Sequence, residues 1–175
     1  MQPQHIILMG FKNVGKSTIG EKFAQATKRS FLDLDQEIQK YYECIHNESI
    51  SCREIMQRHG EDFFRSIEHS TLTNILGSHE PLVIALGGGT PMQETNHELL
   101  QKNIIIHITA PKSIVFERIM IHGKPAFFPK GQDAFETFQQ LWSEREPVFQ
   151  KLATITINNT SSIEDAVDIL IQQLS

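Results

Sequence analysis

The sequence predicts an α/β fold in which helices cover both faces of a parallel β-sheet. Four or five short apolar runs do not alternate with polar residues, which is typical of strands buried on both faces. Helix-length segments with apolar residues at helical spacing lie between these runs, and this alternation indicates right-handed βαβ units. The expected strands are His5–Met9, Phe31–Asp33, Leu82–Leu86, Ile104–Ile108 and Ala153–Ile157.

Helices are expected between and after these strands. Ser51 and Glu54 have the spacing of a capping box, and Ser161 and Ser162 precede acidic residues in the first turn of the last helix. The expected helices are Lys16–Thr27, Asp35–Tyr42, Ser51–Arg58, Asp62–Leu76, Glu94–Lys102, Ser113–Ile121, Ala134–Gln150 and Ile163–Leu174.

Length and composition favour a single domain over residues 1–175. The chain is 39% hydrophobic and 21% charged, which is typical of a globular protein. Its net charge of −5 excludes bulk electrostatic binding to nucleic acid or to an anionic membrane. Every apolar run is far shorter than the ~18 residues of a membrane span, and no secretory signal is recognised at Met1–His5. We therefore expect a cytoplasmic protein.

Cysteine and histidine spacing offers no metal centre built by the protein alone. Cys44 and Cys52 are too few for a disulfide framework, and we expect both to be reduced thiols. The eight histidines are too widely spaced to pair on one helix, and we expect them at the surface or loosely packed.

The segment after the first expected strand has the pattern of a phosphate-binding loop. Residues 10–17, Gly-Phe-Lys-Asn-Val-Gly-Lys-Ser, match G-x-x-x-x-G-K-[ST] between a buried strand and a helix. Gly10 and Gly15 permit a backbone that directs N–H groups at phosphate oxygens, and the helix N-terminus adds partial positive charge. Lys16 supplies a charge for the β- and γ-phosphates, and the Ser17 hydroxyl suits the shell of Mg²⁺. The sequence therefore predicts a nucleoside triphosphate site in this segment, hereafter the P-loop.

Residues Asn13–Thr18 also resemble the phosphate loop of regulatory GTPases, which makes a switch protein an alternative. Those proteins share the motifs Asp-x-x-Gly and Asn-Lys-x-Asp, and neither occurs in this chain. A guanine-binding signature is thus missing. A nucleotide-binding module without catalysis stays open as a second alternative.

Further polar clusters follow the other expected strands, where open α/β sheets bind ligands. They are Asp33-Leu-Asp35, Glu61-Asp-Phe-Phe-Arg65-Ser-Ile-Glu68, Gly87-Gly-Gly89 and the late Arg145-Glu-Pro-Val-Phe149. With the P-loop, these motifs occur in the order found in shikimate kinases. The chain resembles the shikimate kinase family from Ile6 to Leu174.

The resemblance implies a P-loop kinase fold with a five-stranded parallel sheet in the order 2-3-1-4-5. It also implies a substrate-binding segment at about residues 33–65 and a lid at about residues 122–133. The implied reaction is ATP-dependent phosphorylation of the 3-hydroxyl of shikimate, in aromatic amino-acid biosynthesis, with Mg²⁺ as cofactor. We expect a monomer. Another small P-loop kinase, acting on gluconate or a nucleoside monophosphate, is the closest alternative.

The resemblance also implies roles for particular residues. Asp35 would take the ring hydroxyls, including the one that attacks, and Asp33 would reach magnesium through water. Arg65 and Arg145 would hold the carboxylate, and Gly87, Gly88 and Gly89 would line the substrate with backbone N–H groups. The residue chemistry agrees, because guanidinium groups form forked bonds with carboxylates and a carboxylate accepts from hydroxyls. ATP would contact Gly10, Asn13, Val14, Gly15, Lys16, Ser17, Thr18, Arg118 and Lys124, with Lys16, Asp35 and Lys124 catalytic and with Ser17 and Asp33 serving the metal.

Most of these residues also have a purely structural alternative. Arg65 could pair only with Glu61 or Glu68, which flank it at helical spacing. Asp35 could be a helix N-cap, and Asp33 an incidental acid at a strand end. The glycines could form a bare turn, and Arg118 and Arg145 could be surface arginines.

The chain departs from the family pattern on the ATP side. Lys124 stands where an Arg usually begins the lid segment, and Asn13 stands where Gly is common in the P-loop. Asn is tolerable there because it visits left-handed conformations. The loop Asn158–Ser162 lacks the basic residue often found after the fifth strand.

Lys124→Ala is expected to lower kcat more than it changes shikimate affinity, whereas Lys124→Arg should be neutral or faster than the wild type. A guanidinium bridges two phosphate oxygens, but an ammonium acts as a single point charge. Steady-state kinetics on both variants test this. An unchanged kcat in Lys124→Ala would mean that the reaction proceeds without this charge.

Overall fold

The computed structural model describes residues 4–121, 131 and 133–174, and it contains one five-stranded parallel sheet in the order β2-β3-β1-β4-β5. This is the predicted order. Each neighbouring pair of strands is parallel, with Leu8 of the central strand opposite Ala85 on one side and Ile106 on the other. The strands are β1 (Ile6–Met9), β2 (Ser30–Asp33), β3 (Leu82–Ala85), β4 (Ile104–Thr109) and β5 (Ile155–Asn158).

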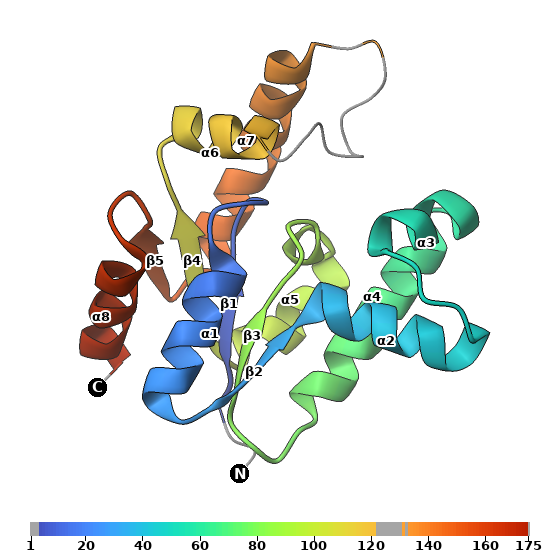
Figure 1. Ribbon diagram of the computed structural model, residues 1–175, viewed down its shortest axis with the longest axis horizontal. Coiled ribbons are helices and arrows are strands. Elements are labelled where there is room, and N and C mark those ends of the chain that lie inside the picture. The colour runs from blue at the N-terminus through green and yellow to red at the C-terminus, as the bar shows by residue number, and fades with distance from the viewer. Residues whose placement is uncertain (1–3, 122–130, 132, 175) are drawn as a thin grey trace.

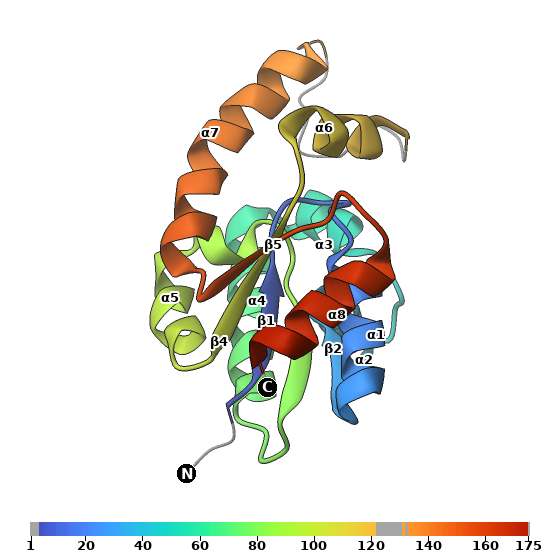
Figure 2. The same ribbon diagram turned by 90° about the vertical axis from the view of Figure 1, so that its left-hand side faces the viewer.

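Helices cover both faces of this sheet, as predicted (Figures 1 and 2). In Figure 2, α1 and α8 lie on one face, and α4, α5 and the C-terminal half of α7 lie on the other. Helix α2 follows β2 at the edge of the sheet, and α3 packs farther out against α2 and α4 (Figure 1). The bounds are α1 (Lys16–Thr27), α2 (Leu34–His46), α3 (Cys52–His59), α4 (Glu61–Leu76), the short 3₁₀ helix η1 (Thr90–Met92), α5 (Glu94–Gln101), α6 (Lys112–Ile121), α7 (Ala134–Leu152) and α8 (Ile163–Leu174).

The continuous apolar runs form strands because both faces of the sheet are covered. All four residues of β1 and all four of β3 are buried, and they belong to the same hydrophobic core as the inner faces of the helices. The P-loop and two of the polar clusters singled out in the sequence, Asp33–Asp35 and Gly87–Gly89, lie at the C-terminal ends of β1, β2 and β3. The P-loop and the segment after β3 therefore meet at the C-terminal edge of the sheet, at the end of the molecule opposite the two chain ends (Figure 1).

Element boundaries differ from the sequence prediction by a few residues, and a capping side chain explains the difference at the start of α2. Helix α2 begins at Leu34 because Asp33 caps it: its Oδ1 accepts from the backbone N–H groups of Asp35 (3.0 Å) and Gln36 (3.4 Å). The cap is thus Asp33, whereas the structural alternative for this helix had been Asp35. The predicted capping box of Ser51 and Glu54 at α3 is confirmed.

The expectation that the histidines lie at the surface or loosely packed is wrong for His5 and His107, each of which is only 1% exposed. Both lie along the central strands β1 and β4, which the helices cover. His5 joins two elements, because its Nε2 lies 3.2 Å from the carbonyl oxygen of Leu76 and its Nδ1 accepts from the N–H of Leu82. Burial lowers the pKa of His107 to about 4, and the charge of Lys16 acts in the same direction.

No helix within the described part of the chain has the length and apolar character needed to cross a membrane.

Candidate active site

The P-loop joins β1 to α1 through backbone conformations that favour glycine. Gly10 has φ 145° and Gly15 has φ 97°, and Asn13 between them adopts the left-handed conformation with φ 62°. A Cβ atom on Gly10 would lie 2.2 Å from the carbonyl oxygen of Ile108, so a side chain there would displace β4. The glycine requirement predicted for this loop is met, and Asn13 takes a conformation that asparagine tolerates.

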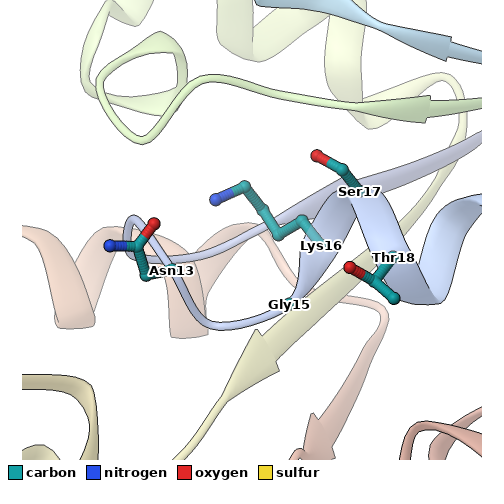
Figure 3. A pocket seen from close by; sticks show the side chains of 5 residues that line it. All are labelled: Asn13, Gly15, Lys16, Ser17 and Thr18. Atoms are coloured by element: carbon teal, nitrogen blue, oxygen red, sulfur yellow. The ribbon is translucent and has the colours of Figure 1, made fainter. Parts of the chain in front are cut away.

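The loop borders an open pocket of about 290 Å³ that is lined by Asn13, Gly15, Lys16, Ser17 and Thr18. Figure 3 shows the Lys16 amine and the Ser17 hydroxyl on one side of the loop, toward the segment that follows β3, while Thr18 points the other way. The Lys16 amine donates to the carbonyl oxygens of Gly10 (3.1 Å) and Phe11 (2.8 Å). The ammonium group of Lys16 is therefore held against the backbone of the P-loop.

Burial lowers the pKa of Lys16 to about 8, against the opposing effect of the nearby carboxylates of Asp35 and Asp33. The amine is thus mostly charged at neutral pH and loses its proton in mildly alkaline solution. An ammonium that is poorly hydrated has the most to gain from an incoming phosphate.

The carboxylate of Asp33 accepts hydrogen bonds from the first turns of both α1 and α2. Its Oδ2 accepts a hydrogen bond of 2.6 Å from the Ser17 hydroxyl, and its Oδ1 caps α2. A hydroxyl and a carboxylate are oxygen donors of the kind Mg²⁺ prefers, and Mg²⁺ takes few ligands from protein in nucleotide sites. The pair of Ser17 and Asp33 therefore fits the predicted divalent metal.

Asp35 lies two residues after Asp33, in the first turn of α2, against the glycine turn formed by Gly87, Gly88 and Gly89. A Cβ atom on Gly87 would lie 2.7 Å from the Asp35 carboxylate, so only glycine permits this approach. Burial raises the pKa of Asp35, the charge of Asp33 raises it further, and the charge of Lys16 lowers it. This carboxylate is thus a stronger base than an aspartate in water.

The two arginines meet at the same turn. Arg65 pairs with Glu68 (2.8 Å) and more loosely with Glu61 (3.4 Å), so the ion pairs considered from the sequence do form. The same guanidinium also lies against Gly89, where a Cβ atom would be 2.7 Å from its Nη2.

Arg145 reaches the turn from α7, donating to the carbonyl oxygen of Gly88 at 3.4 Å. Burial lowers the pKa of Arg145, and the charge of Arg65 contributes in the same direction. The fold therefore holds two guanidinium groups near each other, an arrangement that an anion between them would stabilise.

The structure brings together Lys16, Ser17, Asp33, Asp35, Arg65, Gly87, Gly88, Gly89 and Arg145 at one edge of the sheet. Arg118 lies beside the P-loop: its backbone oxygen accepts from the Asn13 amide (3.3 Å), and its Nη2 donates to the backbone oxygen of Asn159 (3.2 Å). Lys124 and most of the predicted lid at residues 122–133 lie outside the described residues.

Sequence reasoning missed Asn159, which follows β5. Its Nδ2 donates to the carbonyl oxygen of Val14 (2.8 Å), and its backbone N–H donates to Thr109 (2.7 Å). A Cβ atom on Gly15 would lie 2.6 Å from this amide. Asn159 therefore holds the P-loop against the end of β4. Its position after the last strand was the one available signal, since strand ends line the site.

Sequence reasoning also missed the contact between the P-loop and α7. Phe11 stacks on Trp142 with ring centroids 4.7 Å apart and planes 7° apart. Phe138 and Phe149 approach the same ring edge-on, at 5.8 Å and 5.6 Å. This cluster places α7, and with it Arg145, relative to the P-loop.

The comparisons with known proteins agree with this geometry. A sequence profile described as shikimate kinase matches residues 12–175. The chain belongs to the shikimate kinase family. The family's enzymes are ATP-dependent phosphotransferases with an alcohol acceptor and generally need a divalent metal. The predictions of family, fold and activity are confirmed, which sets aside the GTPase switch and the kinases for gluconate or nucleoside monophosphates.

Relatives of this family match most of the chain. A shikimate kinase from Flavobacterium johnsoniae is 38% identical over 123 residues, which are 69% of this chain and 67% of that protein. A shikimate kinase from Bacillus subtilis is 29% identical over 99% of this chain and 90% of its own length. The solved structure of shikimate kinase from Acinetobacter baumannii in complex with shikimate matches with a TM-score of 0.85 and 25% identity, over 98% of this chain and 93% of that one.

ATP affinity is expected to fall as the pH rises above about 8, where Lys16 loses its proton. Phosphate binding favours the charged amine, so affinity is full below this pKa and drops about tenfold per pH unit above it, until the higher pKa of the bound state is reached. Calorimetry with a non-hydrolysable ATP analogue, between about pH 7 and pH 10, measures the effect. Lys16→Met is the control for this measurement, and the same pH dependence of ATP affinity in that variant would assign the effect to another group.

The kcat of Lys16→Met should also be lower than that of the wild type, by roughly a hundredfold to a thousandfold.

Proposed function

We propose that this shikimate kinase transfers the γ-phosphoryl group of ATP to the 3-hydroxyl of shikimate between the P-loop and the glycine turn. The observation that carries the proposal is the convergence of Asp35, Arg65 and Arg145 on this turn, with Asp35 within electrostatic reach of Lys16. Two guanidinium groups that can bind an anion and a carboxylate that can accept from hydroxyls thereby lie beside the P-loop.

Arg65 and Arg145 bind the shikimate carboxylate. Each guanidinium forms forked hydrogen bonds with a carboxylate. The anion also offsets the two causes that lower the pKa of Arg145, which are burial and the charge of Arg65. The glycine turn directs backbone N–H groups at the ring, because no side chain stands between them and the ligand.

Asp35 accepts a hydrogen bond from the attacking hydroxyl and takes its proton as the phosphoryl group is transferred. Its raised pKa suits a general base, and its contact with Gly87 fixes its position. Lys16 and the P-loop N–H groups neutralise charge on the transferring group, in a reaction that is mostly positioning and electrostatic stabilisation.

On the ATP side we propose Mg²⁺ as the divalent cation, held by Ser17 directly and by Asp33 through water. When bound, it neutralises charge on the phosphates. Arg118 contacts adenine, and Lys124 contacts the phosphates from the lid. That residues 33–65 form the substrate-binding segment, and that a single-domain monomer acts in the cytoplasm, also remain our predictions.

Release of ADP by the purified protein tests the proposal. The protein is given MgATP with shikimate, with gluconate, with nucleoside monophosphates or with no acceptor. ADP release that depends on shikimate is expected. Release that depends on another acceptor, or none with any acceptor, would contradict the assignment.

Asp35→Asn and Arg65→Ala should each weaken shikimate binding roughly tenfold to a hundredfold and leave ATP affinity within a few-fold. Each change removes a charge-assisted bond to the substrate, worth about 1.5–3 kcal/mol. Calorimetry with each ligand in turn measures both affinities.

Arg58→Ala is a matched control for Arg65→Ala, because Arg58 lies on the neighbouring helix α3 and pairs with Glu48 at the surface. It should leave both affinities unchanged. Equal weakening of shikimate and ATP in Asp35→Asn or Arg65→Ala would show that these residues support the fold instead of touching the substrate.

A further inference from the structure

Glu68 is a buried carboxylate on α4 with two well-defined partners. It is 1% exposed, and burial of an unpaired carboxylate is costly, so both its oxygens need donors. Oε2 accepts from Nη1 of Arg65 at 2.8 Å, and Oε1 accepts from the hydroxyl of Thr90 at 2.8 Å. The orientation of Arg65 therefore depends on a carboxylate that is itself held from the other side by Thr90.

Thr90 is the residue that directly follows the glycine turn, and it is fully buried. Its backbone N–H donates to the carbonyl oxygen of Gly87 (3.2 Å), which closes the turn. Its own carbonyl oxygen accepts from Nδ2 of Asn96 (3.0 Å), another fully buried residue, on α5. One threonine thus connects the turn, the carboxylate behind Arg65 and helix α5.

The direction of each bond in this chain is determined by chemistry. A carbonyl oxygen only accepts, so the amide nitrogen of Asn96 must face Thr90, and its Oδ1 must face Nδ1 of His69 at 2.6 Å. His69 therefore donates to Asn96, and Asn96 donates to Thr90. The hydroxyl of Thr90 donates to the carboxylate of Glu68. The donors and acceptors of these three hydrogen bonds are thus compatible with one arrangement.

We propose that Thr90 and Asn96 are positioning residues for substrate binding. They hold Glu68, and through it Arg65, at a set place relative to the glycine turn. This inference rests on the proposed role of Arg65 as a ligand of the shikimate carboxylate. The Arg65 guanidinium, which would bind the shikimate carboxylate, and the glycine turn, whose N–H groups would face the ring, are thereby joined through buried hydrogen bonds.

The test compares two buried threonines. Thr90→Val removes the hydroxyl that holds Glu68, and it should raise the KM for shikimate about tenfold while the KM for ATP changes less than about twofold. Thr71→Val is the matched control: Thr71 is also buried on the same helix as Glu68, and its hydroxyl has no hydrogen-bond partner within the described part of the chain. It should leave both KM values unchanged.

Two more variants separate positioning from folding. Thr90→Ser keeps the hydroxyl and should restore most of the shikimate affinity. Asn96→Ala should raise the KM for shikimate in the same direction as Thr90→Val, but by a smaller factor, because it acts one bond further away. Thermal unfolding of all four variants reports any loss of fold.

The proposal is overturned if Thr90→Val matches Thr71→Val in shikimate KM, or if it raises the KM values for shikimate and ATP alike. A Thr90→Ser variant that does not restore the shikimate affinity would also contradict the proposal. Failure of the underlying function is distinguishable: in that case Arg65→Ala itself would leave shikimate affinity unchanged, whatever the threonine variants do.

Discussion

The carboxylate of Asp33 joins the nucleotide half of the site to the substrate half. One oxygen accepts from Ser17 at the start of α1, and the other caps α2 through the N–H groups of Asp35 and Gln36. The first residues of two helices are thereby held by a single side chain at the end of β2. The distance between the Ser17 hydroxyl and the Asp35 carboxylate is set by this short connection, so the proposed metal ligand and the proposed base are held only a few bonds apart.

The second constraint is the close approach of other groups to the backbone around the site, and it explains why glycine recurs there. At Gly10 a side chain would strike the backbone of β4, at Gly87 the carboxylate of Asp35, and at Gly89 the guanidinium of Arg65. The carboxylate of Asp35 and the guanidinium of Arg65 thus lie directly against the backbone, because no side chain at Gly87 or Gly89 keeps them away. The aromatic cluster around Phe11 packs α7 against the P-loop, and α7 brings Arg145 to the turn.

Periodicity and local motifs predicted the strands, the helices and the P-loop because those signals lie within a few residues of one another. The order of the strands and the placement of Asp35 and two distant arginines in one site came from the resemblance of five motifs to a family. Asn159 escaped prediction since its partner Val14 lies 145 positions away. Thr90 and Asn96 escaped for a related reason: a lone buried Thr or Asn has no sequence signature until its partners are placed. His5 and His107 were misjudged because a polar residue within a short apolar run was given no weight.

The stacking of Phe11 on Trp142 has a spectroscopic consequence. Trp142 is the single tryptophan of the chain, and its ring lies against a residue of the P-loop itself. Its intrinsic fluorescence therefore reports from one known place, without a label or an engineered probe. Because Phe11 belongs to the P-loop, nucleotide binding is expected to change the emission of this indole, and stopped-flow mixing would then follow ATP association separately from phosphoryl transfer.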